Sequence, residues 1–377
     1  MDVTGQTGGG GGFVNTVTPT IAADNQTADA LYDFYEICVA YVAPIFYIQG
    51  IVGNVFALVI FFKSKTVRRR EIVDFLIPLA LADLTFLIFG ALINWLQRDM
   101  PHAVGGIEGI KTNILATPGA CKVLSYIGWV GIAAGNWIVV LLTWERAVVM
   151  SAKHALLWLS RAKRLVALAA AVILSALLLI PVLVKYDIDD DGIFIECDYM
   201  VYGKLTDNLL TYLGPTLINV FVFMVPLAAV WIANTILVVH LCKKRRLEGA
   251  EEDDIAELTR RDEERKLVIQ LIAIPTMFLI FTTPPTIFGI WFDWLQYEID
   301  VNNRSDLAAL DTLHIEGLND FFSRLVYINN CLNWIVYIAS LKWFREEARN
   351  ICCPAKRSRN DSELAAPLVR DDAEITS

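Results

Sequence analysis

"LLTWERAVVM", residues 141–150, closes a long apolar run with an acid and a base side by side, Glu145 and Arg146. The stretch before it, "YIGWVGIAAGNWIVV" at 126–140, is apolar almost throughout. A helix that crosses a bilayer needs roughly 20 mostly apolar residues, and the two stretches together supply them. The charged pair therefore stands at one end of a membrane span, where ionisable groups are expensive and usually functional.

The composition extends this interpretation to the whole chain. Of the 377 residues, 55% are hydrophobic and the mean hydropathy is +0.49, whereas a soluble domain is usually about 45–50% apolar. The sequence therefore predicts an all-α membrane protein, a bundle of seven transmembrane helices. The expected spans are 37–62, 72–97, 119–150, 164–184, 213–242, 267–295 and 317–341.

Basic residues decide the orientation of these spans. The first 36 residues contain no Lys or Arg, whereas the segments after spans one, three and five are rich in both. Basic loops stay on the cytoplasmic side. We therefore expect a plasma-membrane protein with an odd number of spans, its N-terminus outside and its C-terminus inside. The inner loops are expected to contact membrane lipid headgroups and not nucleic acid.

Three regions follow from this topology. We expect a disordered outer tail at 1–36, a membrane domain at 37–353 and an inner tail at 354–377. Tripeptides that begin at Asn25 and Asn303 match the glycosylation pattern, and both fall on the expected outer side.

The segment after span seven, "LKWFREEARNICCP", predicts a short amphipathic eighth helix on the inner membrane surface. Cys352 and Cys353 end this helix, where reversible acylation would add a second anchor. The apolar residues that recur at helical spacing are Leu341, Phe344, Ala348 and Ile351.

The remaining cysteines divide by location. Cys121 begins span three on the outer side and Cys197 lies in an acidic outer loop, so the two can form a disulfide in that oxidising compartment. Cys38, Cys242 and Cys331 lie in or beside spans and are interpreted as small buried hydrophobic residues. No Cys/His cluster has the spacing of metal ligands.

Asp83, in "LALADL", is an acid in the middle of span two and must face the bundle interior. Asn54 of span one and three asparagines of span seven could be its partners, forming a hydrated core that holds a cation such as a structural sodium ion. The alternative is a hydrogen-bond network that only packs helices. The span-seven asparagines are Asn329, Asn330 and Asn333.

Arg146 could act as a latch at the inner membrane surface. It can pair with Glu145 and reach across to Glu263 or Glu264, near the inner end of span six. Breaking such a pair would let the two helix ends separate. The alternative is an arginine that only fixes the depth of its span, with its charged end in the interface.

Taken together, these residues resemble the rhodopsin-like (class A) G-protein-coupled receptors over nearly all of 37–353. The interval from Cys121 to Arg146 and the "GN" of span one match that family. Pro226 in span five and Pro284 in span six match its helix-interrupting prolines. Glu264 precedes Pro284 by the family's interval, and Asn333 and Tyr337 match the ends of its Asn-Pro-x-x-Tyr motif.

The resemblance implies a mechanism. An outer ligand would favour a state in which the inner end of span six moves outward, which breaks the Arg146 latch and opens a groove for a heterotrimeric G protein. Span four lacks the Trp that is usual in the family, and four named positions also depart from it. Ala147 and Trp334 replace its usual Tyr and Pro, Thr282 stands where a Trp is usual, and Asn234 replaces a Tyr.

The same resemblance narrows the ligand. Gly128 stands where amine receptors carry an Asp, and Tyr327 where opsins carry the retinal-binding Lys, so neither amine nor retinal is favoured. The loop around Cys197 predicts a hairpin lid of the peptide-receptor kind, and spans six and seven are similar to those of invertebrate FMRFamide/myosuppressin-type neuropeptide receptors. The candidate ligand residues are Glu196, Asp198, Tyr199, Asp293, Tyr297, Asp320, Arg324 and Tyr327.

The acidic outer loops would attract a basic or amidated peptide, or they only complement the basic inner side. Other functions remain as alternatives: an orphan or decoy receptor for a small non-amine ligand, or a membrane transporter. The sequence has no inverted repeat of the transporter kind. It also lacks a Ser/His/Asp or intramembrane His/Glu arrangement that would indicate an enzyme.

Overall fold

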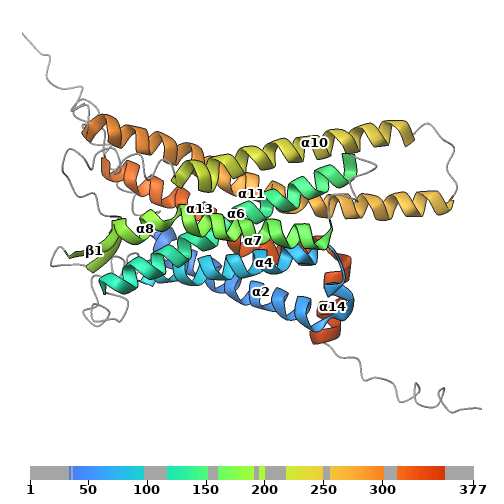
Figure 1. Ribbon diagram of the computed structural model, residues 1–377, viewed down its shortest axis with the longest axis horizontal. Helices are drawn as coiled ribbons and strands as arrows, with labels where there is room; N and C mark the ends of the chain where they lie inside the picture. The colour runs from blue at the N-terminus through green and yellow to red at the C-terminus, as the bar shows by residue number, and fades with distance from the viewer. Residues whose placement is uncertain are drawn as a thin grey trace, which may run out of the picture.

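Long helices lie side by side in a computed structural model that describes residues 34, 37–96, 117–151, 160–190, 195–199, 218–248, 255–300 and 312–352 (Figure 1). Short π-helical segments, labelled η, continue some of them. In chain order the spans are η1 Cys38–Val42 with α2 Ala43–Lys63, α4 Val73–Thr85 with η2 Phe86–Leu92, α6 Pro118–Ser151, α7 Arg161–Leu178 with α8 Ile180–Lys185, η5 Val220–Met224 with α10 Val225–Glu248, α11 Ile255–Asp300 and α13 Thr312–Ser340.

The predicted seven-helix bundle is confirmed. Among the described residues, six helices are long and apolar enough to cross a membrane, and α13 is not one of them. Its sequence carries Asp320, Arg324 and several asparagines. Helix α13 nevertheless packs against α2 on one side and α11 on the other, so it closes the bundle.

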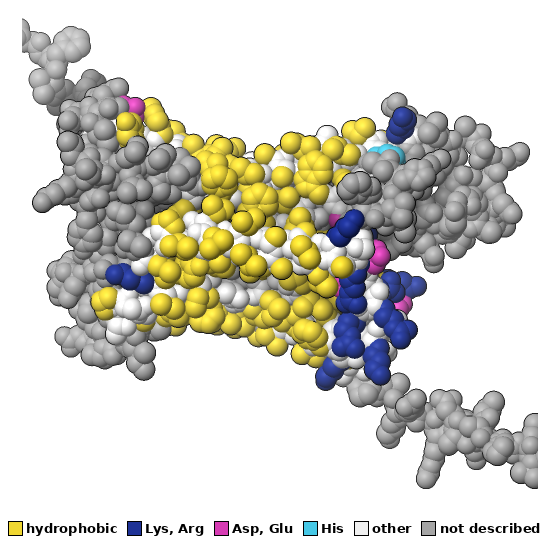
Figure 2. Space-filling model, in the orientation of Figure 1, with side chains coloured by type: hydrophobic (Ala, Val, Ile, Leu, Met, Phe, Trp, Pro, Cys, Tyr) yellow, Lys and Arg dark blue, Asp and Glu magenta, His cyan; other side chains and the backbone are white. Residues whose placement is uncertain are grey.

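Apolar side chains cover the outside of the bundle. Figure 2 shows a hydrophobic belt over the middle of the helices, with Lys and Arg side chains gathered at one end. Polar groups such as Asn54, Asp83 and Asn333 are buried instead. This distribution is that of a chain whose solvent is lipid. On α2 the exposed apolar residues recur at helical spacing: Ile45, Ile48, Val52 and Val55.

Small residues let neighbouring spans approach closely. A Cβ added to Gly128 of α6 would lie 2.7 Å from the Cα of Gly90 in η2. A Cβ added to Gly50 of α2 would lie 2.8 Å from the Cα of Cys331 in α13. Without a hydrophobic driving force between helices in lipid, such backbone contacts are a main source of helix association.

Pro226 leaves a gap in the hydrogen bonds of span five, and span three fills it. Proline has no N–H to donate to the carbonyl four residues earlier, that of Val222. The π-helical segment η5 ends just before this proline. Asn136 of α6 donates its Nδ2 to the Val222 carbonyl oxygen at 2.8 Å. A backbone group freed inside the membrane is thereby satisfied by a neighbouring helix.

The two ends of the bundle differ. At the end that the sequence predicts to be outside, which we call the outer end, strands β1 Tyr186–Asp190 and β2 Ile195–Tyr199 form an antiparallel hairpin in which Ile188 lies opposite Cys197, which confirms the predicted hairpin. At the other end, which we call the inner end, α14 Lys342–Cys352 lies across the bundle (Figure 1). This is the predicted eighth helix.

Helices α10 and α11 continue past the membrane spans, to Glu248 and from Ile255. A short helix, α3 Lys65–Arg68, follows the first span. Ser64 caps this helix, because its side-chain oxygen accepts a hydrogen bond from the backbone N–H of Val67.

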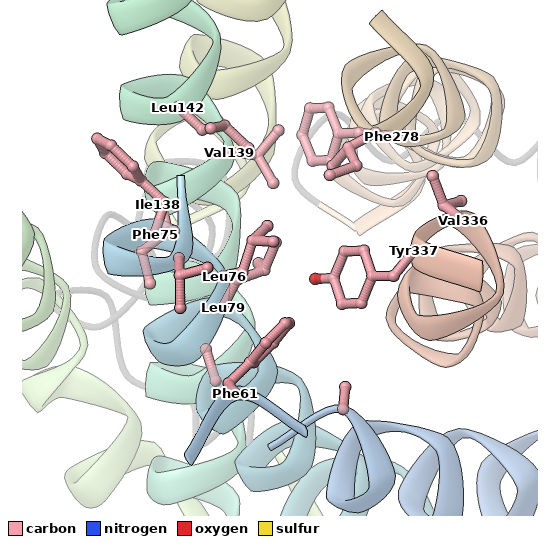
Figure 3. Packing of buried hydrophobic residues seen from close by; sticks show 14 of the residues in the cluster. Phe61, Phe75, Leu76, Leu79, Ile138, Val139, Leu142, Phe278, Val336 and Tyr337 are labelled. Atoms are coloured by element: carbon pink, nitrogen blue, oxygen red, sulfur yellow. The ribbon is translucent and has the colours of Figure 1, made fainter. Parts of the chain in front are cut away.

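The inner half of the bundle holds an apolar core. Figure 3 shows side chains of α2, α4, α6, α11 and α13 meeting around Tyr337. The Tyr337 ring centroid lies 5.8 Å from those of Phe61 and Phe344. The eighth helix is therefore anchored to the bundle through the aromatic ring of Phe344.

Candidate functional site

A cavity of about 250 Å³ occupies the outer half of the bundle. Its walls come from η2, α6, η5, α11 and α13, so five spans meet around it. The wall combines apolar and aromatic residues with convergent polar groups, as ligand sites do. The polar side chains that line it are Asn94, Ser125, Asn219, Thr286, Asp293, Asn319, Ser323 and Tyr327.

Asp293 is the charged side chain among the residues that line this cavity. Its Oδ2 accepts a hydrogen bond from Asn219 Nδ2 at 2.8 Å, which joins span five to span six. An ionised carboxylate can accept further hydrogen bonds. Asp293 therefore retains the capacity to bind a cationic or donor group in the cavity.

Of the candidate ligand residues Arg324 and Tyr327, only Tyr327 lines the cavity. Tyr327 lines the cavity, and its ring centroid lies 4.8 Å from that of Phe86. Arg324 is buried and does not line the cavity. Its Nη1 lies 3.4 Å from Asn94 Oδ1, and its guanidinium carbon is 5.1 Å from the Tyr327 ring centroid. Arg324 therefore supports the cavity wall from behind.

The other candidate ligand residues lie outside this wall or outside the described side chains. Tyr297 is 41% exposed and does not line the cavity. For the remaining four, the side chains are not among those that the structure describes: Glu196, Asp198, Tyr199 and Asp320.

Asp83 meets one of its predicted partners in the middle of the bundle. Asn333 donates its Nδ2 to Asp83 Oδ2 at 2.7 Å. Asn54 instead donates to the backbone oxygens of Gly50 at 3.0 Å and Asn330 at 3.1 Å. A direct hydrogen bond from Asn54 to Asp83 is therefore not formed, because the Asn54 amide donates to a backbone oxygen of its own helix and to one of span seven.

Asp83 Oδ1 is buried and meets no hydrogen-bond partner among the described residues. Asn329, also buried, lies on the same helix as Asn333. A carboxylate oxygen and amide oxygens are ligands suited to a hard cation, so these residues fit a sodium ion. Among the described residues there is no group of three His, Cys, Asp or Glu that could hold a metal ion.

At the inner end of the bundle, Glu145 is held by two arginines. Its Oε2 lies 3.5 Å from Arg146 Nε, and its Oε1 lies 3.7 Å from Arg164 Nη1 of span four. Arg164 Nη2 also lies 3.2 Å from Asp74 Oδ2 of span two. The side chain of Glu264, the expected partner of Arg146, lies outside the described side chains.

Sequence reasoning missed this connection between spans two, three and four. Asp74 lies at the start of span two and Arg164 at the start of span four. The sequence does show each charge separately: Arg164 comes directly before an uninterrupted apolar run, and Asp74 comes before another. Each was therefore recognisable as a charge at the end of a span. The two charges come from chain segments whose proximity no local pattern reveals.

Tyr337 and Trp334 stand where the family motif has its Tyr and Pro. The Tyr337 hydroxyl is buried and meets no hydrogen-bond partner among the described residues. Trp334 Nε1 donates to Gln49 Oε1 at 3.1 Å, and Gln49 Nε2 donates to the Cys331 carbonyl oxygen at 3.2 Å. Trp334 therefore ties span seven to span one, a contact that a proline cannot make.

Of the helix-interrupting prolines, Pro226 is buried at the start of α10 and Pro284 is exposed within α11. Thr282, in the position of the usual Trp, is fully buried. It lies in α11 one turn before Thr286, whose hydroxyl donates to the Thr282 carbonyl oxygen at 2.7 Å.

The modification sites are described only in part. Cys121 is disulfide-bonded, and the side chain of its predicted partner Cys197 is not among those described. Cys352 is free and exposed at the end of α14. Three further predicted sites lie outside the described residues: Asn25, Asn303 and Cys353.

Two comparisons with known proteins agree with this arrangement. The model of the 7 transmembrane receptor (rhodopsin family) matches residues 53–337. That region contains Asp83 and Arg146 and ends at Tyr337. The B2 bradykinin receptor of Cavia porcellus is 22% identical over 357 residues, which cover 90% of this chain and 84% of that receptor. The chain, a multi-pass membrane protein, belongs to the rhodopsin family of seven-transmembrane receptors.

Proposed function

We propose that this protein is a plasma-membrane receptor, with its N-terminus outside, that is activated by an extracellular peptide and signals through a heterotrimeric G protein. The observation that carries the proposal is the cavity in the outer half of the bundle, with Asp293 in its wall. Cys121, near the start of α6, lines the cavity, whereas Arg146 lies near the end of the same helix.

A basic group on the peptide suits this cavity. Asp293 supplies a carboxylate, and the described wall holds no Lys or Arg to compete for it. Aromatic residues such as Trp129 and Tyr327 add faces on which a cation or ring can stack. The bradykinin receptor named above supports a peptide as the ligand class. The other candidates, Glu196, Asp198, Tyr199, Asp320 and Tyr297, would act at the cavity mouth.

Signalling would follow from differential binding. The peptide must bind the state with span six displaced outward more tightly than the resting state. In that state Arg146 leaves Glu145, any contact with Glu264 is broken, and the inner surface admits the G protein. Tyr337 would move with span seven, because it is part of α13, and its contacts with the aromatic rings of Phe61 and Phe344 would change.

A screen of basic and amidated peptides against cells that express the chain, read by calcium and cyclic-nucleotide signals, identifies the ligand. Asp293→Asn should then weaken a peptide with a cationic group by about tenfold to a hundredfold, the usual effect of a charged hydrogen bond. An analogue with the cation replaced by a neutral isostere is the control. Equal losses of affinity for both peptides would show that Asp293 does not bind the cationic group.

We also propose that Asp83, with Asn329 and Asn333, binds a sodium ion in the resting state. Asp83 then supplies the charge, and Asn333 holds one of its oxygens in place. Raising sodium at constant ionic strength should lower agonist affinity in the unaltered receptor. Asp83→Asn should abolish this dependence, and a persisting sodium effect in that variant would exclude the site.

Covalent modification completes the proposal. A Cys121–Cys197 bond would join the hairpin to the top of α6, glycans at Asn25 and Asn303 would mark the outer side, and acyl chains on Cys352 and Cys353 would anchor α14. Mass spectrometry of the intact receptor tests each bond and group. Unmodified residues at these positions would contradict the assignments one by one.

A decoy receptor that binds ligand without signalling is the second candidate, because Ala147 and Trp334 depart from the family motifs. Agonist-driven nucleotide exchange on a purified G protein separates the two. Exchange that is lost on Arg146→Ala, with ligand binding intact, supports the signalling receptor. Ligand binding without any exchange across the G-protein classes supports the decoy.

A further inference from the structure

The latch acid Glu145 is shared between two helices. Arg146 approaches one carboxylate oxygen from its own helix at 3.5 Å, and Arg164 of α7 approaches the other at 3.7 Å. Both contacts are longer than an ideal charged hydrogen bond, which is about 2.7–2.9 Å. The carboxylate is thus divided between two cations rather than committed to one.

Arg164 is divided in the same way. Its Nη2 lies 3.2 Å from Asp74 Oδ2, and its Nη1 lies 3.6 Å from Glu71 Oε1. Asp74 in turn has Arg161 Nη2 at 3.0 Å from its Oδ1. We call the whole set the inner ion cluster: Glu71, Asp74, Glu145, Arg146, Arg161 and Arg164.

Three side chains of the inner ion cluster are buried, so the loss of a charged partner is costly for them. The side chains of Glu145, Arg164 and Asp74 are only 3%, 6% and 8% exposed. A buried charge that loses its only partner is strongly destabilising, because nothing replaces the lost solvation. When Arg146 moves away from Glu145, Arg164 remains to compensate the carboxylate. The cost of releasing Arg146 therefore depends on how strongly Arg164 binds Glu145.

We propose that Arg164 is a positioning residue that sets the strength of the Arg146 latch, and that Asp74 tunes it by competing with Glu145 for Arg164. The proposal rests on the proposed function, in which release of Arg146 accompanies signalling. It requires the geometry of spans two, three and four alone, and no contact with the ligand or the G protein.

Substitutions of the two partners of the Asp74–Arg164 ion pair should then change ligand-independent signalling in opposite directions. Arg164→Gln leaves Glu145 with Arg146 as its remaining cation, so release becomes costlier and ligand-independent signalling falls about fivefold. Asp74→Asn removes one carboxylate that competes for Arg164, so Arg164 binds Glu145 more closely, release of Arg146 becomes cheaper and ligand-independent signalling rises about fivefold. These sizes correspond to the coupling usual between residues of one charged network.

Nucleotide exchange on a purified G protein, measured per receptor in membranes that contain the full chain, tests the proposal. Arg164→Lys is the charge-conserving control and should restore most of the activity lost in Arg164→Gln. Combining either Arg164→Gln or Asp74→Asn with Glu145→Gln removes the shared carboxylate, so both effects should vanish there. Loss of packing alone would lower activity in both single variants.

Changes of the same sign in the two single variants would overturn the proposal, and so would effects that persist in Glu145→Gln. Failure of the proposed function gives a different result. If the unaltered chain drives no exchange, spin labels at Lys65→Cys of α3 and Lys266→Cys of α11 report the separation of the inner helix ends. Opposite shifts of that distance distribution in Arg164→Gln and Asp74→Asn would still support the inner ion cluster, and unchanged distributions would refute it.

Discussion

Tyr337 brings a hydroxyl group into the most apolar part of the inner core. Its ring fits well between Phe61 and Phe344, but its oxygen meets no hydrogen-bond partner among the described residues. A buried polar group left unpaired costs about 1–3 kcal/mol. The structure therefore bears a penalty that a rearranged core could relieve, as the proposed movement of span seven would allow.

Replacing Tyr337 with Phe should raise the stability of the ligand-free receptor by about 1 kcal/mol, because the ring stays and the unpaired hydroxyl goes. Thermal unfolding of the purified receptor measures the change. Tyr126→Phe is the matched control and should lower stability, since the Tyr126 hydroxyl donates to the Ala176 carbonyl oxygen at 2.8 Å. Destabilisation by Tyr337→Phe would show that its hydroxyl has a partner in the resting state.

Helices α2 and α13 fit together because a glycine on one lies against a tryptophan on the other. Gly53 of α2 lies under the indole ring of Trp334, so closely that an added Cβ would overlap the ring. The Gln49–Trp334 hydrogen bond fastens the same two helices. A bulky residue in the place of a family proline is thus accommodated by a missing side chain on the neighbouring span.

Gly53→Ala should destabilise the receptor by about 1–3 kcal/mol, the usual cost of overpacking a tight core. Gly119→Ala is the control, because a Cβ there meets nothing within 4 Å. Apparent melting temperatures of the two purified variants, compared with the unaltered chain, provide the measurement. The contact would be looser than described if both alanines were equally harmless.

Asn136→Ala should cost about 1–3 kcal/mol, because it leaves the Val222 carbonyl without a donor. Pro226→Ala supplies a backbone N–H for the same carbonyl. The double variant should therefore lose less than Asn136→Ala alone, as unfolding of all three proteins in detergent would show. If the two losses simply add, the carbonyl is not what links the residues.

At the scale of the whole molecule, sequence predicts most of the fold because lipid imposes strong rules. Long apolar runs, basic inner segments and the periodic residues before Cys352 predict the spans and α14. Charged contacts between distant segments resist such prediction, so Asn54 was given the wrong partner and the Asp74–Arg164 pair was missed. The cavity lining was anticipated through Asp293 and Tyr327, whereas only packing shows that Arg324 lies behind the wall.

The orientation of the whole bundle is also testable. A tag added before residue 1 should bind antibody on intact cells, and a tag added after Ser377 should bind only after the cells are permeabilised, because the basic segments hold the inner loops in the cytoplasm. Expression of each tagged chain is compared in permeabilised cells. Staining of both tags on intact cells would contradict seven membrane crossings.

Biosynthesis must treat α13 differently from the other spans. Helix α13 is not among the helices apolar enough to qualify as a span by composition alone, so its contacts with helices already in the bilayer should help to retain it, with Asn333 meeting Asp83 and Trp334 meeting Gln49. The first span, through Gln49, therefore contributes to the insertion of the last span. Substitutions at these contacts would strand newly made chains in the endoplasmic reticulum for degradation, so their first sign would be missing receptor at the cell surface.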